Sequence, residues 1–135
     1  MRNPNAESAA VANRTKGKRV LLVEDNINQQ RMCILAFRCK FPHHEMKAAS
    51  TGREALRIAK DFSPEVVLVD FGLPDMDGSE LGKLLREDAG LENAVFISLS
   101  GSGEPEDFQR SEAAGYVKHV VKPPDLDELE RGFWA

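Results

Sequence analysis

Long apolar runs are missing from this 135-residue sequence, and none approaches the roughly 20 residues that a membrane-spanning helix needs. The N-terminus also lacks the apolar segment of a secretory signal peptide. Cysteine is scarce: Cys33 and Cys39 lie six positions apart in one predicted helix, where they would not face each other. We interpret both as reduced thiols. These absences predict a cytoplasmic location and no membrane contact by this domain.

A large excess of charge of either sign is absent as well. Lys and Arg together number 18 and Asp and Glu together number 22, so the formal net charge is −4. This mild acidity argues against direct binding of nucleic acid. Hydrophobic residues make up 41% of the chain and charged residues 30%, which is typical of a folded domain and too apolar for a disordered chain.

The chain divides into two parts by composition. Residues 1–17 are rich in Asn, Ala, Ser and charge and show no periodicity, which predicts a disordered arm or a linker. In residues 18–135, five apolar segments typical of strands alternate with five predicted helices; the strands are expected near 20–23, 45–49, 66–69, 95–99 and 119–121. This alternation predicts an α/β domain with a parallel sheet and helices on both faces.

Helix boundaries carry recognisable signals. A residue that accepts a hydrogen bond, followed three positions later by Glu or Gln, predicts a capping box at three helix starts. These pairs are Asn26 with Gln29, Thr51 with Glu54, and Asp125 with Glu128. We interpret Asp75 as a turn residue and Asp77 as an N-cap. A helix is expected over 104–114, with Gly115 as the C′ residue directly after it.

Polar residues follow four of the five apolar segments. Glu24 and Asp25 come after the first, Asp70 after the third, Ser100 after the fourth and Lys122 after the fifth. Functional groups gather at the carboxyl ends of parallel strands, so these side chains are expected to meet at one edge of the sheet. Three carboxylates placed together repel one another unless a cation lies among them, and Mg²⁺ prefers such oxygen ligands.

This set of groups suits phosphoryl transfer onto an aspartate. Asp70 is the best acceptor because it follows the most apolar segment and precedes a sharp loop, while Asp25 and Glu24 would hold the metal. Each residue taken alone has a plainer interpretation: an Asp after a strand is usually a turn former, and a lone Lys or Ser is usually on the surface. The coincidence at four strand ends favours the functional interpretation.

Four segments closely resemble the receiver domain of two-component response regulators. They are Val20–Asn26, Val69–Gly78, Leu99–Gly101 and Val121–Pro123, in the family's order and spacing. The resemblance covers the chain from about residue 18 to the end, and it implies a flavodoxin-like (CheY-like) fold with strand order 2-1-3-4-5. Glu24-Asp25-Asn26 followed by Asn28 is also similar to receivers attached to hybrid histidine kinases.

The resemblance further implies a phosphorelay function and assigns its residues. Asp70 would take a phosphoryl group from a phosphohistidine of a histidine kinase or phosphotransfer protein, in a reaction that depends on Mg²⁺. Such a protein is a phosphoacceptor with self-catalysed phosphorylation and dephosphorylation, not an enzyme acting on diffusing substrates. The implied metal ligands are Asp25, Asp70, Glu24 through water, and the Gly72 carbonyl; Ser100 and Lys122 would bind the phosphoryl group, and the peptide bond before Pro123 would be cis.

One position departs from the commonest pattern of the family. The switch residue, usually Tyr or Phe, corresponds to His119, because Tyr116 lies three residues too early. The resemblance implies that Ser100 and His119 act together as the switch, the ring turning inward when the Ser100 hydroxyl moves toward the phosphoryl group. A histidine ring is polar and titratable, so either it acts as the switch or it is a half-buried ring without that role. Gly72 and Ser102 are small residues beside the expected site, which predicts fairly rapid loss of the phosphoryl group.

Other functions are less compatible with these residues. A haloacid-dehalogenase-like phosphatase needs an Asp-x-Asp pair after the first strand, and a flavin or dinucleotide carrier needs a Gly-rich or Ser/Thr-rich loop there; neither is present. A degenerate receiver, acting as a phosphorylation-independent interaction module, is the remaining alternative. Dimerisation through the last two helices and the last strand is common in the family and is a further expectation.

Overall fold

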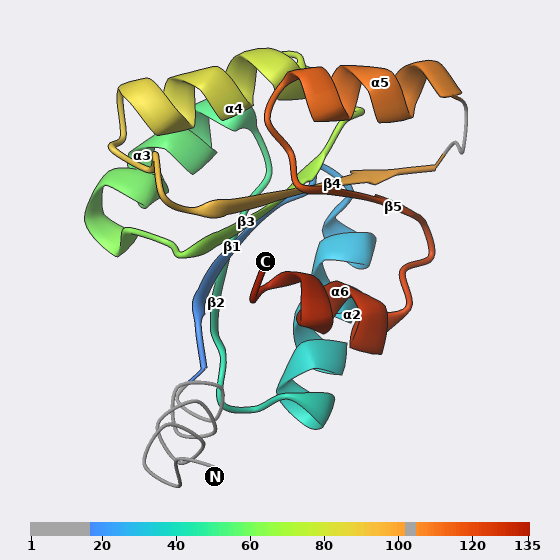
Figure 1. Ribbon diagram of the computed structural model, residues 1–135. Coiled ribbons are helices and arrows are strands. Elements are labelled where there is room, and N and C mark those ends of the chain that lie inside the picture. The colour runs from blue at the N-terminus through green and yellow to red at the C-terminus, as the bar shows by residue number, and fades with distance from the viewer. Residues whose placement is uncertain (1–16, 102–104) are drawn as a thin grey trace, which may run out of the picture.

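The computed structural model describes residues 17–101 and 105–135, except for the side chain of Asp107. The expected arm over 1–17 therefore lies outside the described residues, apart from Gly17. Five parallel strands form one sheet in the order β2-β1-β3-β4-β5 (Figure 1). The strands are β1 (Arg19–Val23), β2 (Glu45–Ala49), β3 (Val66–Asp70), β4 (Val95–Ser100) and β5 (Lys118–Val121). The expected fold class and strand order are confirmed.

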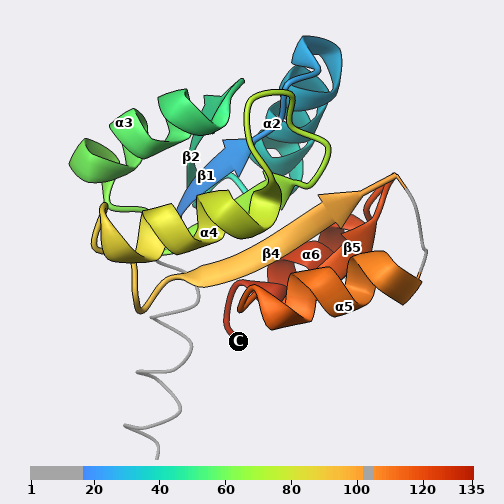
Figure 2. The same cartoon turned by 90° about the horizontal axis from the view of Figure 1, so that it is seen from above.

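Helices cover both faces of the sheet. They are α2 (Ile27–Lys40), α3 (Gly52–Phe62), α4 (Gly78–Glu87), α5 (Pro105–Ala113) and α6 (Leu126–Gly132). Figures 1 and 2 show α3, α4 and α5 on one face and α2 and α6 on the other. The start that we expected for α5, Glu104, lies outside the described residues, and the helix ends at Ala113, one residue before the predicted end.

The central strands are buried on both faces, which explains their continuous apolar runs. Alternate residues of β1 point to opposite sides: Leu21 and Val23 pack toward α3 and α4, whereas Val20 and Leu22 pack toward α2 and α6. On the α2 side, the rings of Phe37 and Phe133 stack with centroids 5.6 Å apart. Two apolar layers therefore hold the sheet in place, and its carboxyl-terminal edge is free to carry polar groups.

The predicted N-caps are present, but the second, reciprocal bond of a capping box is not formed in any of the three pairs, all of which the structure describes. Asn26 accepts from the Gln29 amide, and Thr51 and Asp125 cap α3 and α6 in the same way. The reciprocal bond from the Gln29 side chain is not formed, because the Asn26 amide donates to the Glu24 carboxylate instead. A carboxylate is a stronger acceptor than a carboxamide, so the box prediction was wrong at this point.

Two acidic residues of the loop after β3 have different roles. Asp77 is the N-cap of α4, as expected. Asp75 does more than form a turn: its carboxylate accepts from the amides of Gly52 and Arg53, 22 to 23 residues earlier, at the start of α3. The interpretation of Asp75 as a local turn residue was therefore incomplete. These bonds hold its pKa below the ordinary value, with the Gly52 amide as the largest cause.

Three further findings bear on the sequence predictions. Gly115 adopts φ +85°, the left-handed conformation expected just after a helix. Cys33 and Cys39 are both unpaired, and burial raises the pKa of the Cys33 thiol to about 11. Among the described residues, no helix combines the length and apolar character needed to cross a bilayer.

Candidate functional site

The polar residues predicted at four strand ends meet at one edge of the sheet. Glu24 directly follows β1, Asp70 and Ser100 are the last residues of β3 and β4, and Lys122 directly follows β5. The strands run parallel and in register, with Val23 beside Val69 and Ser100 beside Val121. This geometry brings residues almost one hundred positions apart into contact.

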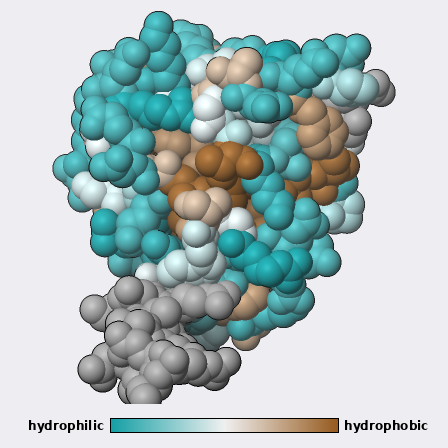
Figure 3. Space-filling view, in the orientation of Figure 1, coloured by the Kyte–Doolittle hydropathy of each residue, from teal (hydrophilic) through white to brown (hydrophobic). Residues whose placement is uncertain are grey.

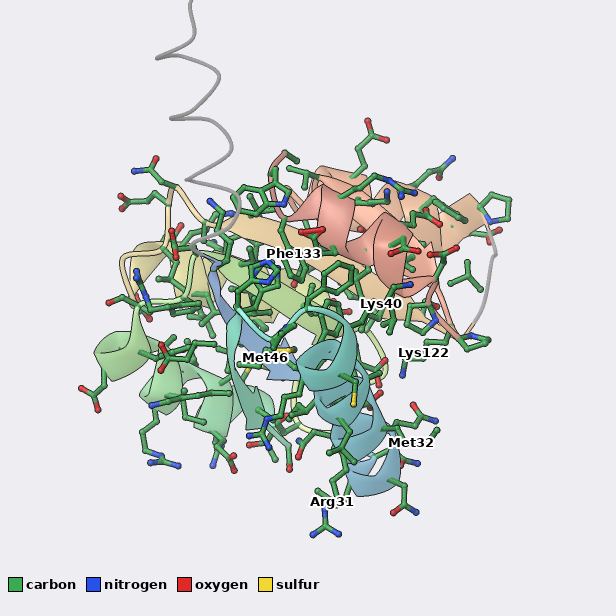
Figure 4. All side chains as sticks on the ribbon, turned by 90° about the horizontal axis from the view of Figure 1, so that it is seen from below. Arg31, Met32, Lys40, Met46, Lys122 and Phe133 are labelled. Atoms are coloured by element: carbon green, nitrogen blue, oxygen red, sulfur yellow. The ribbon has the colours of Figure 1, made fainter. Side chains whose placement is uncertain are left out.

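Lys122 lies at the centre of this group. Its Nζ is 2.6 Å from Glu24 Oε1 and 3.1 Å from Asp70 Oδ2. Glu24 and Asp70 are only 3% and 8% exposed, so this ammonium compensates charges that have been removed from water. Figure 4 shows Lys122 beyond the edge of the sheet, on the side of α2 that carries Met32.

A residue that the sequence analysis missed also contacts the lysine. Gln29 Oε1 accepts from Lys122 Nζ at 3.1 Å. Gln29 lies in the first turn of α2, directly after the loop that carries Glu24. The only sequence signal was its place three residues after Asn26, which we assigned to capping. Gln30 also holds this loop, because its side-chain amide donates to the Glu24 carbonyl at 3.1 Å.

The carboxylates of the site are arranged as possible metal ligands. One oxygen from each of Glu24, Asp25 and Asp70 lies within 4.8 Å of the others, and Asp25 is exposed. The second oxygen of Asp70, Oδ1, accepts from the Gly72 amide at 2.9 Å. Gly72 is itself exposed, directly beside the carboxylates. The donor set is therefore hard oxygen next to solvent, which suits a hydrated divalent cation such as Mg²⁺.

The two buried carboxyl groups titrate as a pair. Burial, and then the neighbouring Asp70, raise the pKa of Glu24 to about 7, although Lys122 and the Asn26 amide oppose this shift. Burial acts in the same direction on Asp70, but hydrogen bonds with Glu24, Gly72 and Lys122 outweigh it, and the pKa of Asp70 is lowered. The carboxylate oxygens of Glu24 and Asp70 lie within 4.8 Å of each other, and two negative charges so close repel. A proton on Glu24 relieves this repulsion.

The fourth strand end is joined to the lysine through the backbone. Ser100 is 8% exposed, and its carbonyl accepts from the Lys122 amide at 2.7 Å. The peptide bond between Lys122 and Pro123 is cis. Ser102, the other small residue named above, lies outside the described residues.

His119 and Tyr116 occupy different places above the sheet. Tyr116 is buried, donates from its hydroxyl to the Gly78 carbonyl at 2.8 Å and packs on Phe71, so it belongs to the core beside α4. Burial raises the pKa of its hydroxyl. His119 is half-buried on β5, with its ring centroid 4.4 Å from that of Phe108 on α5.

A second group of ligating side chains lies at the opposite end of the sheet. His43, His44 and Glu130 offer atoms within 4.8 Å of one another. However, the Lys18 amide donates to His44 Nδ1 at 2.9 Å, so the neutral ring carries its proton on Nε2, which faces Glu130. Burial also lowers the pKa of His44. We interpret this group as a structural contact between the segment directly before β2 and α6.

The sequence that carries these carboxylates, lysine and hydroxyl matches a known protein family. A family model described as "Response regulator receiver domain" matches residues 20–132. The chain belongs to this family. It is a receiver domain of the response-regulator type, consistent with two-component signalling, and receiver domains are signalling domains rather than classical enzymes.

Two curated proteins similar to this chain are named as regulatory proteins. The chain is 35% identical over 111 residues to the regulatory protein AtoC of Escherichia coli, covering 82% of this chain and 23% of AtoC. It is 35% identical over 110 residues to the transcriptional regulatory protein KdpE of Mycobacterium tuberculosis, covering 82% of this chain and 46% of KdpE. The chain therefore spans less than half the length of these two relatives.

Solved structures share the fold. The chemotaxis protein CheY4 of Vibrio cholerae has a TM-score of 0.75 and 28% identity, with 85% of this chain and 98% of that chain covered. A second match comes from the complex between the phosphotransfer protein Ypd1 and the receiver domain of Ssk1 from Saccharomyces cerevisiae. Its TM-score is 0.74 with 25% identity, covering 87% of each chain.

Proposed function

We propose that this receiver domain accepts a phosphoryl group on Asp70 from a phosphohistidine, in a reaction that depends on Mg²⁺. The observation that carries the proposal is the position of the Asp70 carboxylate. Lys122 Nζ lies 3.1 Å from one of its oxygens, the Gly72 amide 2.9 Å from the other, and two further carboxylates lie beside it. A nucleophile, a counter-charge and a cation-binding set are therefore present together.

The transfer requires little covalent chemistry from the protein. A lone pair on an Asp70 carboxylate oxygen forms the new bond to phosphorus while the phosphorus–nitrogen bond of the donor breaks. The electron pair of that bond leaves with the imidazole of the donor. Lys122 offers its ammonium, and Ser100 its hydroxyl, to oxygens of the arriving group, since both border Asp70 at the same edge. Attack by water on the acyl phosphate later releases inorganic phosphate and restores Asp70.

The residues present fit a magnesium ion. Glu24, Asp25, Asp70 and the Gly72 carbonyl are the groups that would hold it, with water completing the coordination. Bound there, Mg²⁺ supplies positive charge that stabilises the transferring phosphoryl oxygens. The raised pKa of Glu24 is consistent with this assignment: burial is its main cause, and a divalent cation at this site would compensate the buried negative charge.

An apolar groove beside the site supports docking of the phosphoryl donor. The groove has a volume of about 490 Å³ and runs between α2 and the segment after β5, with Met32, Pro124 and Leu126 in its lining. Met32 lines the groove and is 69% exposed (Figure 4), and Leu35, one helical turn further along α2, is 57% exposed. Exposed apolar surface of this kind favours contact with a protein partner, here a histidine kinase or phosphotransfer protein.

Exposed apolar side chains near β5 support a homodimer contact as well. Val117 and Val121 are 58% and 40% exposed, and Phe108 on α5 is 42% exposed. Figure 3 shows apolar surface over the region of β4 and β5 on this face. Sedimentation of the protein with and without a phosphoryl analogue tests this part separately; a monomer in both conditions contradicts it.

Intact-mass measurement after incubation with Mg²⁺ and phosphoramidate tests the main proposal. Wild-type protein and the matched control Asp77→Asn are expected to gain one phosphoryl group, whereas Asp70→Asn gains none. Chelation of Mg²⁺ is expected to abolish the adduct. An adduct on Asp70→Asn overturns the assignment of the acceptor. Absence of an adduct from all three proteins favours the degenerate receiver, which acts by binding alone.

A further inference from the structure

Two buried serines and the half-buried His119 form a chain of hydrogen bonds between β4, α5 and β5. Ser98 Oγ lies 2.6 Å from Ser111 Oγ and 2.5 Å from His119 Nδ1. Ser98 is completely buried and Ser111 is 1% exposed. Buried hydroxyl groups need hydrogen-bond partners within the protein, because water cannot reach them to replace a lost partner. The hydrogen-bonded chain thus joins the core of the sheet directly to the ring of His119.

This contact fixes where the His119 ring lies. The ring sits under α5, with its centroid 4.4 Å from Phe108 and 6.2 Å from Phe71. Its other nitrogen, Nε2, is buried and has no hydrogen-bond partner among the described residues. Ser98 is therefore the polar anchor of the ring, and rotation of the ring toward solvent requires that this bond break.

The position of Ser98 relates the anchor to the phosphoryl site. Ser98 and Ser100 are two residues apart on β4, so their side chains point to the same face of the sheet. Asp70 pairs with Leu99, the residue between them. Ser100 at the phosphoryl site and Ser98, which contacts His119, are therefore neighbouring positions on one face of β4.

We infer that Ser98 is a positioning residue that keeps the His119 ring inward before any phosphoryl group arrives. The inward position of the His119 ring therefore does not depend on movement of the Ser100 hydroxyl. The surface that α5 and β5 present around Phe108 is already formed in the unphosphorylated protein. This inference rests on the proposed function, since a switch residue has meaning only in a receiver that is phosphorylated on Asp70.

Nuclear Overhauser effects between the His119 and Phe108 rings test the inference, and the protein has three histidines to assign. Spectra are recorded with Mg²⁺ alone and with Mg²⁺ plus beryllofluoride, an analogue of the phosphoryl group. In wild-type protein the ring contacts are expected in both states. In Ser98→Ala, loss of one hydrogen bond is expected to raise the outward ring population about tenfold without the analogue. Ser111→Ala is the matched control, since it removes a hydroxyl from the same pair but keeps the bond to His119.

Two results overturn the inference: ring contacts that appear in wild-type protein only after beryllofluoride is added, or Ser98→Ala spectra that match those of the wild type. The first needs no variant, so it decides the question even if Ser98→Ala does not fold. Failure of beryllofluoride to shift the Gly72 amide instead contradicts the proposed function. In that case the comparison made without the analogue still decides whether Ser98 holds the ring.

Discussion

Replacing Lys122 by Met tests whether the ammonium stabilises the buried carboxylates as the geometry indicates. At about pH 8, above the Glu24 pKa of about 7, both neighbours are charged. Unit charges 2.6 to 3.1 Å apart attract by roughly 5 to 6 kcal/mol per pair at an effective dielectric constant of about 20. Desolvation offsets a large part of this attraction, but removing one partner leaves the carboxylates uncompensated. We therefore expect Lys122→Met to lower the free energy of unfolding by about 3 kcal/mol without Mg²⁺.

The same variant is expected to recover stability when Mg²⁺ is present. A divalent cation at the carboxylates replaces the missing positive charge, so saturating Mg²⁺ should reduce the loss to about half. Urea unfolding followed by circular dichroism measures both values. Lys40→Met is the matched control: Lys40 lies 2.9 Å from Asp127, but both side chains are about half exposed, so the expected loss is below about 1 kcal/mol in either buffer.

Two results would refute this reasoning. One is a loss for Lys122→Met as small as that for Lys40→Met, which would mean that the carboxylates do not depend on the ammonium. The other is an equal loss with and without Mg²⁺, which would mean that no cation binds beside Glu24 and Asp70.

Three further predictions concern the same edge of the sheet. Because a proton on Glu24 competes with the metal up to about pH 7, the apparent Mg²⁺ affinity should rise on the order of tenfold between about pH 5.5 and 7.5, and a flat calorimetric profile contradicts this. Asp75→Ala should lower the free energy of unfolding by about 1 kcal/mol, since two amides at the start of α3 lose their acceptor; unchanged urea unfolding contradicts the capping role. Gly72→Arg should slow loss of the phosphoryl group by shielding Asp70 from water, and an equal decay of the phosphorylated mass removes that argument.

The Glu24 prediction has a counterpart in stability. In the folded protein without metal, Glu24 holds its proton up to about pH 7, whereas the unfolded chain releases it near the ordinary glutamate pKa of about 4.5. The contribution of Glu24 to the free energy of unfolding therefore decreases as the pH rises through this range. Asp70 acts in the opposite sense, because its lowered pKa adds stability that is lost at acidic pH.

Local patterns in the chain were enough to predict the layered fold. Apolar runs such as Val66–Val69 must be buried on both faces, and helical segments between them leave only parallel pairing. The same logic placed Asp70 and Lys122 at one edge, because every parallel strand ends on the same side. N-caps at Asn26, Thr51 and Asp77 followed from chemistry within three residues of each helix start.

The particular partners within the site depended on distant contacts. Gln29 could bond to Asn26 or to Lys122, and only the approach of β5, 93 residues away, decides for the lysine. Asp75 reaches the start of α3 from a loop 23 residues later in the chain. No local rule predicts these choices, because each depends on which acceptor the folded backbone brings nearest.

Residue order by itself therefore determined the sheet, its helices and the edge at which the charged groups gather, since burial periodicity and strand direction are local properties. Tertiary structure alone decided which hydroxyl holds His119, how the proton is shared between Glu24 and Asp70, and where an apolar groove opens beside them. Those properties arise from distances below about 3 Å and from exclusion of water, which exist only once the chain has folded.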